Sequence, residues 1–138
     1  MTAPHLFRIL VQVDDIEAAA AFYAAVLGFS GERVAKGRHY FNCGSTILAL
    51  LDPKGDGEGA VAQPLPTDLY FAVDELEPVR AAITAHGGRL APGEVHGDPA
   101  GEVARRPWGE LSFYAFDPSG NPLCFVKRGS EFLGRPRG

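Results

Sequence analysis

A short pattern occurs twice in this chain, sixty positions apart. Residues 13–17 read Val-Asp-Asp-Ile-Glu, and residues 73–77 read Val-Asp-Glu-Leu-Glu. In each copy the first aspartate, Asp14 or Asp74, is a candidate helix cap, and the glutamate three residues later can return a hydrogen bond to that cap. The chain is therefore expected to contain two copies of one module, each with a helix that begins at this pattern.

Each pattern stands between an expected strand and an expected helix. Residues 7–13 and 68–73 alternate apolar and other side chains, which predicts a strand with one face on the helix. Apolar residues at helical spacing then continue to a glycine stop, Gly28 in the first copy and Gly87-Gly88 in the second. Further strands are expected at 31–36, 38–43 and 46–51, and again at 89–95, 110–116 and 122–127.

These elements predict a single α+β domain made of two tandem βαβββ modules that form a curved mixed sheet around a small-molecule cavity. A length of 138 residues with 46% hydrophobic residues suits one domain with a real core. A sheet with a helix on one face and mixed side chains on the other suggests a cleft. The expected parts are module 1 at about 5–51, a Gly- and Pro-rich linker at 52–67, module 2 at about 68–128 with a mobile loop at 97–107, and a tail at 129–138 that is either disordered or a cover over the cavity.

Composition excludes several classes of partner. A formal net charge of −4 offers no basic surface for nucleic acid, and no apolar run reaches the roughly 18 residues of a membrane span. Cys43 and Cys124 lie in apolar segments without a partner at metal or redox spacing, so both are expected to be reduced thiols. A cytoplasmic protein with a small-molecule ligand is the expectation.

Several short motifs, taken in order, resemble a known family. The set resembles the vicinal-oxygen-chelate superfamily of glyoxalases, ring-cleaving dioxygenases and bleomycin-resistance proteins, over about residues 7–127. The resemblance implies paired βαβββ modules, a homodimer, and ligand grooves at or near the dimer interface, and it is strongest to the bleomycin-resistance branch. The motifs are Asp15-Ile16, Phe22-Tyr23, Leu27-Gly28-Phe29, Pro107-Trp108-Gly109 with Phe113, and Asp117-Pro118-Ser119-Gly120-Asn121.

Metal-dependent members of that superfamily carry a His/His/Glu-type ligand set. The resemblance assigns the corresponding positions to Arg8, Ala49, Asp68 and Cys124. Arginine has no free lone pair and alanine has no donor atom, so two candidate ligands are left where a catalytic site needs about three. We therefore expect no metal and no other cofactor.

Arg8 and Asp68 occupy equivalent places in the two modules. One hypothesis is that they pair, within a chain or across a dimer, in the space that a metal would fill. The alternative is that each is solvated at the mouth of the cavity, since exposed ion pairs contribute little stability.

Aromatic residues supply further candidates. Trp108 can stack on a planar ligand, or it can fill the core or the dimer interface. Tyr70 is a weaker candidate, and only one of Phe113 and Tyr114 can face inward because they are adjacent on a strand. The predicted ligand-binding residues are Arg8, Asp68, Tyr70, Trp108, Phe113 and Cys124.

Two functions are compatible with this sequence. The first is a non-catalytic protein that binds an aromatic, heterocyclic or cationic small molecule and sequesters a toxic compound, as in antibiotic resistance. The second is an enzyme of the same superfamily, a lyase, isomerase or dioxygenase, either metal-dependent or metal-free. A metal-free enzyme would draw its acid or base from Asp68, His39 or Tyr70.

Overall fold

A computed structural model describes residues 2–134 of the chain. The first module forms a four-stranded sheet in the order β1-β4-β3-β2, in which β1 runs parallel to β4 and the other pairs are antiparallel. Its elements are β1 (Arg8–Gln12), α1 (Ile16–Leu27), β2 (Glu32–Ala35), β3 (Arg38–Cys43) and β4 (Thr46–Leu51).

The second module repeats this arrangement. Its main strands follow the order β5-β11-β10-β6, with β5 parallel to β11, and β9 also pairs with β10. A separate hairpin pairs β7 with β8. The elements are β5 (Leu69–Val73), α2 (Leu76–Ala85), β6 (Arg89–Leu90), β7 (Glu94–Val95), β8 (Asp98–Pro99), β9 (Ala104–Arg105), β10 (Leu111–Phe116) and β11 (Pro122–Lys127).

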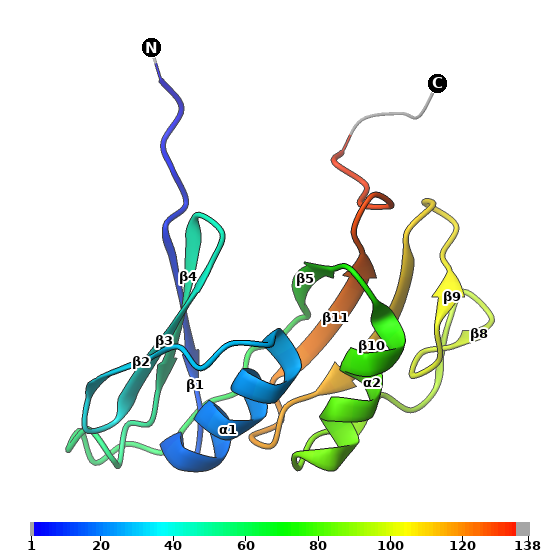
Figure 1. The fold of residues 1–138 in the computed structure, drawn as a ribbon. Helices are drawn as coiled ribbons and strands as arrows, with labels where there is room; N and C mark the ends of the chain where they lie inside the picture. Colours follow the sequence, from blue (N-terminus) through cyan, green and yellow to red (C-terminus); the bar gives the residue numbers. More distant parts are fainter. Residues whose placement is uncertain (1, 135–138) are drawn as a thin grey trace.

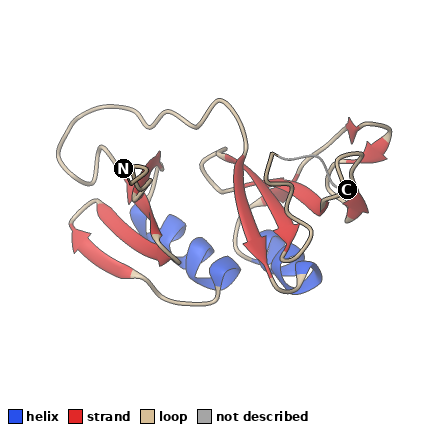
Figure 2. Cartoon of the chain, turned by 90° about the horizontal axis from the view of Figure 1, so that it is seen from above, coloured by secondary structure: helices blue, strands red, loops and turns tan. Residues whose placement is uncertain are grey.

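Both modules therefore have the predicted βαβββ plan, and the predicted α+β class is confirmed. The two helices pack against each other, and each covers one face of its own sheet (Figures 1 and 2). Neither described helix has the length and apolar character that crossing a bilayer requires.

One hydrophobic core runs through both modules. Val11 and Phe22 from the first module and Ile83, Phe113 and Phe125 from the second belong to the same cluster, and all five are fully buried. The alternation predicted for the first strand of each module holds for Ile9, Val11 and Val13 and for Leu69, Phe71 and Val73, which belong to the core or pack on it. Phe7 has the same parity but precedes β1 and is 54% exposed, so the expectation that it covers the helix is wrong.

The helix caps differ from the prediction. Asp15, not Asp14, caps α1, because its Oδ1 accepts the N–H groups of Glu17 and Ala18. The α2 helix has Glu75 at its cap position without a side-chain cap bond, since Asp74 accepts the Nε–H of Arg128 instead. Tertiary partners thus decide which acidic residue caps each helix.

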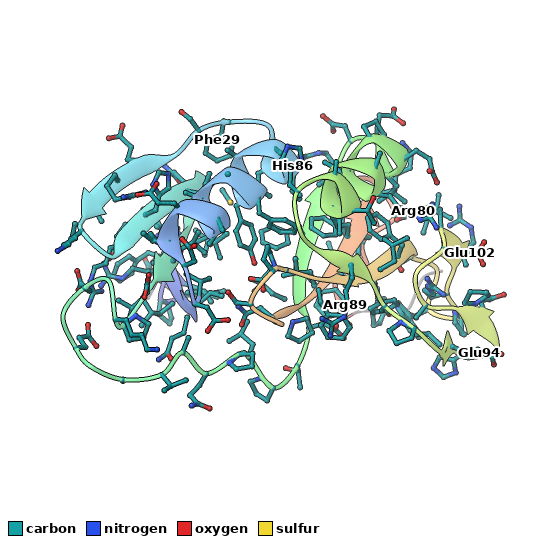
Figure 3. All side chains as sticks on the ribbon, turned by 90° about the horizontal axis from the view of Figure 1, so that it is seen from below. Phe29, Arg80, His86, Arg89, Glu94 and Glu102 are labelled. Atoms are coloured by element: carbon teal, nitrogen blue, oxygen red, sulfur yellow. The ribbon has the colours of Figure 1, made fainter. Side chains whose placement is uncertain are left out.

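The segment between α2 and β10 contains more and shorter strands than the sequence predicted. The strand expected at 89–95 is split into β6 and β7, and the expected loop at 97–107 contains β8 and β9. Arg80 of α2 donates its Nε–H to the carbonyl of Gly101, so this segment is tied to the helix as well as to the sheet (Figure 3).

The loop after β10 joins the two modules. Asp117 accepts a 2.7 Å hydrogen bond from the hydroxyl of Tyr23 on α1, and Asn121 donates to the carbonyl of Gln12 on β1. The Asn121 side chain also accepts the N–H of Leu65 from the linker. This loop therefore fixes the position of module 2 relative to α1 and β1.

Candidate functional site

The second face of the second sheet, opposite α2, carries a row of polar side chains. Tyr70 on β5, Cys124 on β11 and Tyr114 on β10 are direct neighbours in the strand register. Since successive residues of a strand point to opposite faces, their neighbours Phe71, Phe113 and Phe125 point to the core instead. A thiol is thus placed between two phenols on one sheet face.

The row changes from exposed to buried along its length. Tyr70 is 55% exposed, Tyr114 is 7% exposed and Cys124 is fully buried. Ala100 from the segment between α2 and β10 packs against Tyr114 and Cys124, which explains this difference. A ligand therefore has direct access to the row at its Tyr70 end.

Residues 91–109, between β6 and β10, are called the covering segment, and Arg106 holds this segment in place. Its guanidinium donates to the Ser112 hydroxyl at 3.1 Å, to the Ser112 carbonyl at 2.9 Å and to the Glu102 carbonyl at 3.0 Å. It also lies 5.1 Å from the centre of the Tyr114 ring and is 2% exposed. These bonds connect the covering segment to β10.

Burial favours the neutral forms of the side chains in the row. It raises the pKa of the Cys124 thiol to about 12 and also raises the pKa values of Tyr70 and Tyr114. The thiol and both phenols are neutral near pH 7 even at their usual pKa values, and they therefore stay neutral hydrogen-bonding groups further into the alkaline range. Burial likewise raises the pKa of Asp68, whose charge acts on both Tyr70 and Cys124.

Arg8 and Asp68 do not pair within the described chain. Arg8 is exposed on β1 of the first sheet, with its guanidinium carbon 5.0 Å from the centre of the Phe7 ring. Among residues 2–134 no ion pair includes Asp68. This geometry leaves two interpretations, a pair across two copies and the alternative that each residue is solvated.

The residues at the positions of the superfamily's metal ligands do not suit a divalent ion. Arg8 and Ala49 face the second side of the first sheet, in register with Ile47 and Leu10 respectively, and neither offers a lone pair to a metal. Asp68 and Cys124 belong to the other sheet, and a hard carboxylate with a neutral buried thiol is an unfavourable set. No group of three or more His, Cys, Asp or Glu side chains suited to a metal occurs among residues 2–134.

A cleft of about 620 Å³ lies between the two modules. Leu27 and Phe29 line it from module 1, and Tyr70 and Phe71 line it from module 2. The cleft and the polar row share only Tyr70. The lining also includes Asn42, Asp74 and Arg128, and a cleft of this size with mixed apolar and polar lining is compatible with a small-molecule site.

Comparison with known proteins agrees with the fold. Residues 5–125 match the sequence profile of the Glyoxalase/Bleomycin resistance protein/Dioxygenase superfamily. The chain belongs to this superfamily. No protein with a curated description matches the sequence.

Solved structures of superfamily proteins superimpose on the chain. A glyoxalase/bleomycin resistance protein from Albidiferax ferrireducens T118 is similar at 25% identity with a TM-score of 0.69, over 88% of this chain and 97% of that one. A glyoxalase-related enzyme from Fulvimarina pelagi is 20% identical with a TM-score of 0.71, over 91% and 89%. A lactoylglutathione lyase from Agrobacterium tumefaciens is 21% identical with a TM-score of 0.63, over 93% and 96%.

Within this superfamily fold, the aromatic candidates occupy different environments. Phe113 lies in the core, stacked on Phe125 at 5.4 Å, and Tyr114 takes the position on the second face. Trp108 is half-buried, and its indole N–H is donated to Glu110 at 2.8 Å. His39 faces the α1 side, with its Nε2 2.8 Å from the Ser30 carbonyl, and so lies away from the row.

Sequence reasoning missed Arg106 and Glu110, both of which are buried beside the row. The sequence contained a signal for Glu110, because Glu110, Ser112 and Tyr114 alternate along one predicted strand and so share one of its faces. Arg106 gave no such signal, since its role depends on how the covering segment folds back over β10.

Proposed function

We propose that this protein binds an aromatic or heterocyclic small molecule on the second face of its second sheet, without the metal of the superfamily's enzymes. The observation that carries this proposal is the row of Tyr70, Cys124 and Tyr114, which places neutral polar groups on a sheet face and exposes one ring to an adjoining cleft. Sequestration of a toxic compound is the role we infer, and we place it in the cytoplasm, where the two free thiols stay reduced.

A second copy of the chain would complete this site. Leu6, Phe7 and Leu10 are each more than 40% exposed around Arg8, so an apolar surface surrounds an unpaired cation on β1. Asp68 lies half-buried beside Tyr70 and has no cation in the described chain. In a homodimer, Arg8 of one protomer would pair with Asp68 of its partner at the edge of the ligand site.

Charge reversal tests the pair across copies. Arg8→Asp and Asp68→Arg should each weaken the dimer in sedimentation or gel filtration at micromolar concentration, because like charges then face each other twice. An equimolar mixture of the two variants should recover the dimer, since each contact again joins opposite charges. Recovery on mixing is impossible for a pair within one chain.

The matched control reverses an ion pair that lies within module 1. Glu17→Arg with Arg33→Glu exchanges the partners of an exposed bidentate contact of 2.9–3.0 Å and should leave the oligomeric state unchanged. A wild-type protein that sediments only as a monomer would exclude the shared site. A mixture that stays monomeric would exclude the Arg8 and Asp68 contact.

Ligand binding is tested by thermal shift with a panel of small aromatic and heterocyclic compounds. A ligand at 100 times its Kd stabilises the native state by about 2.7 kcal/mol, which is readily measured as a higher Tm. Elemental analysis of the purified protein should detect no stoichiometric Ni, Zn, Fe or Mn. A tightly held ion of this kind would favour the metal-dependent enzyme instead.

One observation favours a metal-free enzyme as the second candidate. Burial raises the pKa of Asp68, and a carboxylate with a raised pKa beside a cleft is suited to general-base chemistry. In that case Asp68→Asn would abolish turnover while ligand binding persists. For a simple binding protein the same substitution would change affinity only.

A further inference from the structure

Glu110 is a buried carboxylate at the end of the polar row. It precedes β10 and shares the strand parity of Ser112 and Tyr114, which places it on the same face. It is 8% exposed, and its charge acts on both Tyr70 and Cys124. Glu110 therefore belongs to the surroundings of the proposed ligand site.

Each carboxylate oxygen of Glu110 accepts a different hydrogen bond. Oε1 accepts the indole N–H of Trp108 at 2.8 Å, and Oε2 accepts the backbone N–H of Phe132 at 2.9 Å. Hydrogen bonds to an ionised group are among the stronger ones in proteins. One side chain thus holds an aromatic residue of the covering segment and an aromatic residue of the C-terminal segment.

The C-terminal segment turns back toward β10 after β11. The hydroxyl of Ser130 accepts the N–H of Leu111 at 3.1 Å and donates to the carbonyl of Lys127 at 2.7 Å. Phe132 is nevertheless 41% exposed and Leu133 is 75% exposed. The segment therefore offers exposed apolar side chains next to the start of β10, the strand that carries Tyr114.

We propose that residues 129–133, together with Trp108 of the covering segment, form a wall of the ligand site, and that Glu110 is the positioning residue that sets its two aromatic members, Trp108 and Phe132. The proposal rests on the proposed function, because it assigns this segment to the same small-molecule site. Since Trp108 and Phe132 are both aromatic, the wall presents aromatic surface and favours ligands with an aromatic portion.

Hydrogen exchange tests the Glu110 contacts without any ligand. In the wild-type protein, the Phe132 amide and the Trp108 indole N–H should exchange at least about tenfold more slowly than in an unstructured chain, as expected for bonds to a carboxylate. In Glu110→Gln one of the two carboxylate oxygens is replaced by an NH2 group, which cannot accept a hydrogen bond, so the N–H that loses its acceptor should exchange about tenfold faster. The control is Glu102→Gln, an exposed site on the covering segment.

A neutral dye, N-phenyl-1-naphthylamine, tests the wall itself by its fluorescence. Wild-type protein should bind the dye saturably, and Phe132→Ala should weaken binding several-fold. Since Phe132 lies in a partly exposed terminal segment, this variant remains informative even if Glu110→Gln does not fold. Glu102→Gln should bind the dye as the wild type does.

The outcomes separate this proposal from the proposed function. Unprotected Phe132 and Trp108 N–H groups in the wild type would overturn the positioning role of Glu110. Dye binding that is the same in Phe132→Ala and the wild type would overturn the wall alone. A wild-type protein that takes up no dye and no compound of the thermal-shift panel would overturn both proposals together.

Discussion

At the residue scale, two motifs that carried the family resemblance meet in one hydrogen bond. Tyr23 of α1 and Asp117 of the loop after β10 are 94 positions apart in the chain, and both are buried. Asp117 also accepts the backbone N–H groups of Ser119 and Asn121. The motifs that contain Tyr23 and Asp117 are therefore explained by the docking of the two modules.

Tyr23→Phe should lower the free energy of unfolding by about 1–3 kcal/mol, because it removes one donor from a buried carboxylate. Urea denaturation at pH 7 measures this change. The matched control is Tyr70→Phe, which removes a hydroxyl from a largely exposed ring and should change stability much less. Equal effects of the two substitutions would contradict the structural role of the buried bond.

The same tyrosine predicts an alkaline loss of stability. Burial, followed by the nearby Asp117 charge, raises the pKa of Tyr23 well above its usual value of 10.0. Below pH 10 the phenol is neutral in both states, and above pH 10 it ionises first in the unfolded chain. Wild-type stability should therefore fall above pH 10 more steeply than that of Tyr23→Phe, in urea titrations across that range.

At the scale of the element, helix starts depend on tertiary partners as much as on local sequence. Two adjacent aspartates precede α1, and only the side chain of Asp15 accepts hydrogen bonds from N–H groups of the helix. The backbone N–H of Asp14 is occupied by the Ser119 hydroxyl from module 2. Local propensity identified the helix, and the contact between modules selected the cap.

Asp15→Ala should cost about 1 kcal/mol of stability, the usual effect of removing a side-chain cap. Asp14→Ala should cost less, because the Asp14 contact uses the backbone and survives the substitution. Thermal denaturation of both variants measures the difference. A larger loss for Asp14→Ala would restore the cap that the sequence pattern suggested.

At the scale of the whole molecule, a single core joins the modules and the loop after β10 locks them together. Gly88 shows how tightly they meet, since a Cβ at this position would lie 2.6 Å from the Phe22 ring of α1. Residues from both modules belong to one hydrophobic cluster. The modules are repeats in sequence, yet they share one core in space.

This shared core predicts a single cooperative unfolding transition. Trp108 is the only tryptophan in the chain and reports on module 2, whereas far-UV circular dichroism reports on both helices. The two signals should have the same urea midpoint. Two separated midpoints would mean that the modules fold independently.

The sequence by itself determined the two-module plan and most of what faces the core, because strand and helix periodicities are local properties of the chain. It also identified Tyr70 as a candidate on the face opposite the helix and Tyr114 as one of two adjacent alternatives, whereas Cys124 was a candidate through the family resemblance. The tertiary structure placed Phe113 in the core, buried Arg106, and brought Glu110, Trp108 and Phe132 together. Those outcomes depend on strand order and on how a covering segment folds back, and both are set by contacts between residues distant in sequence.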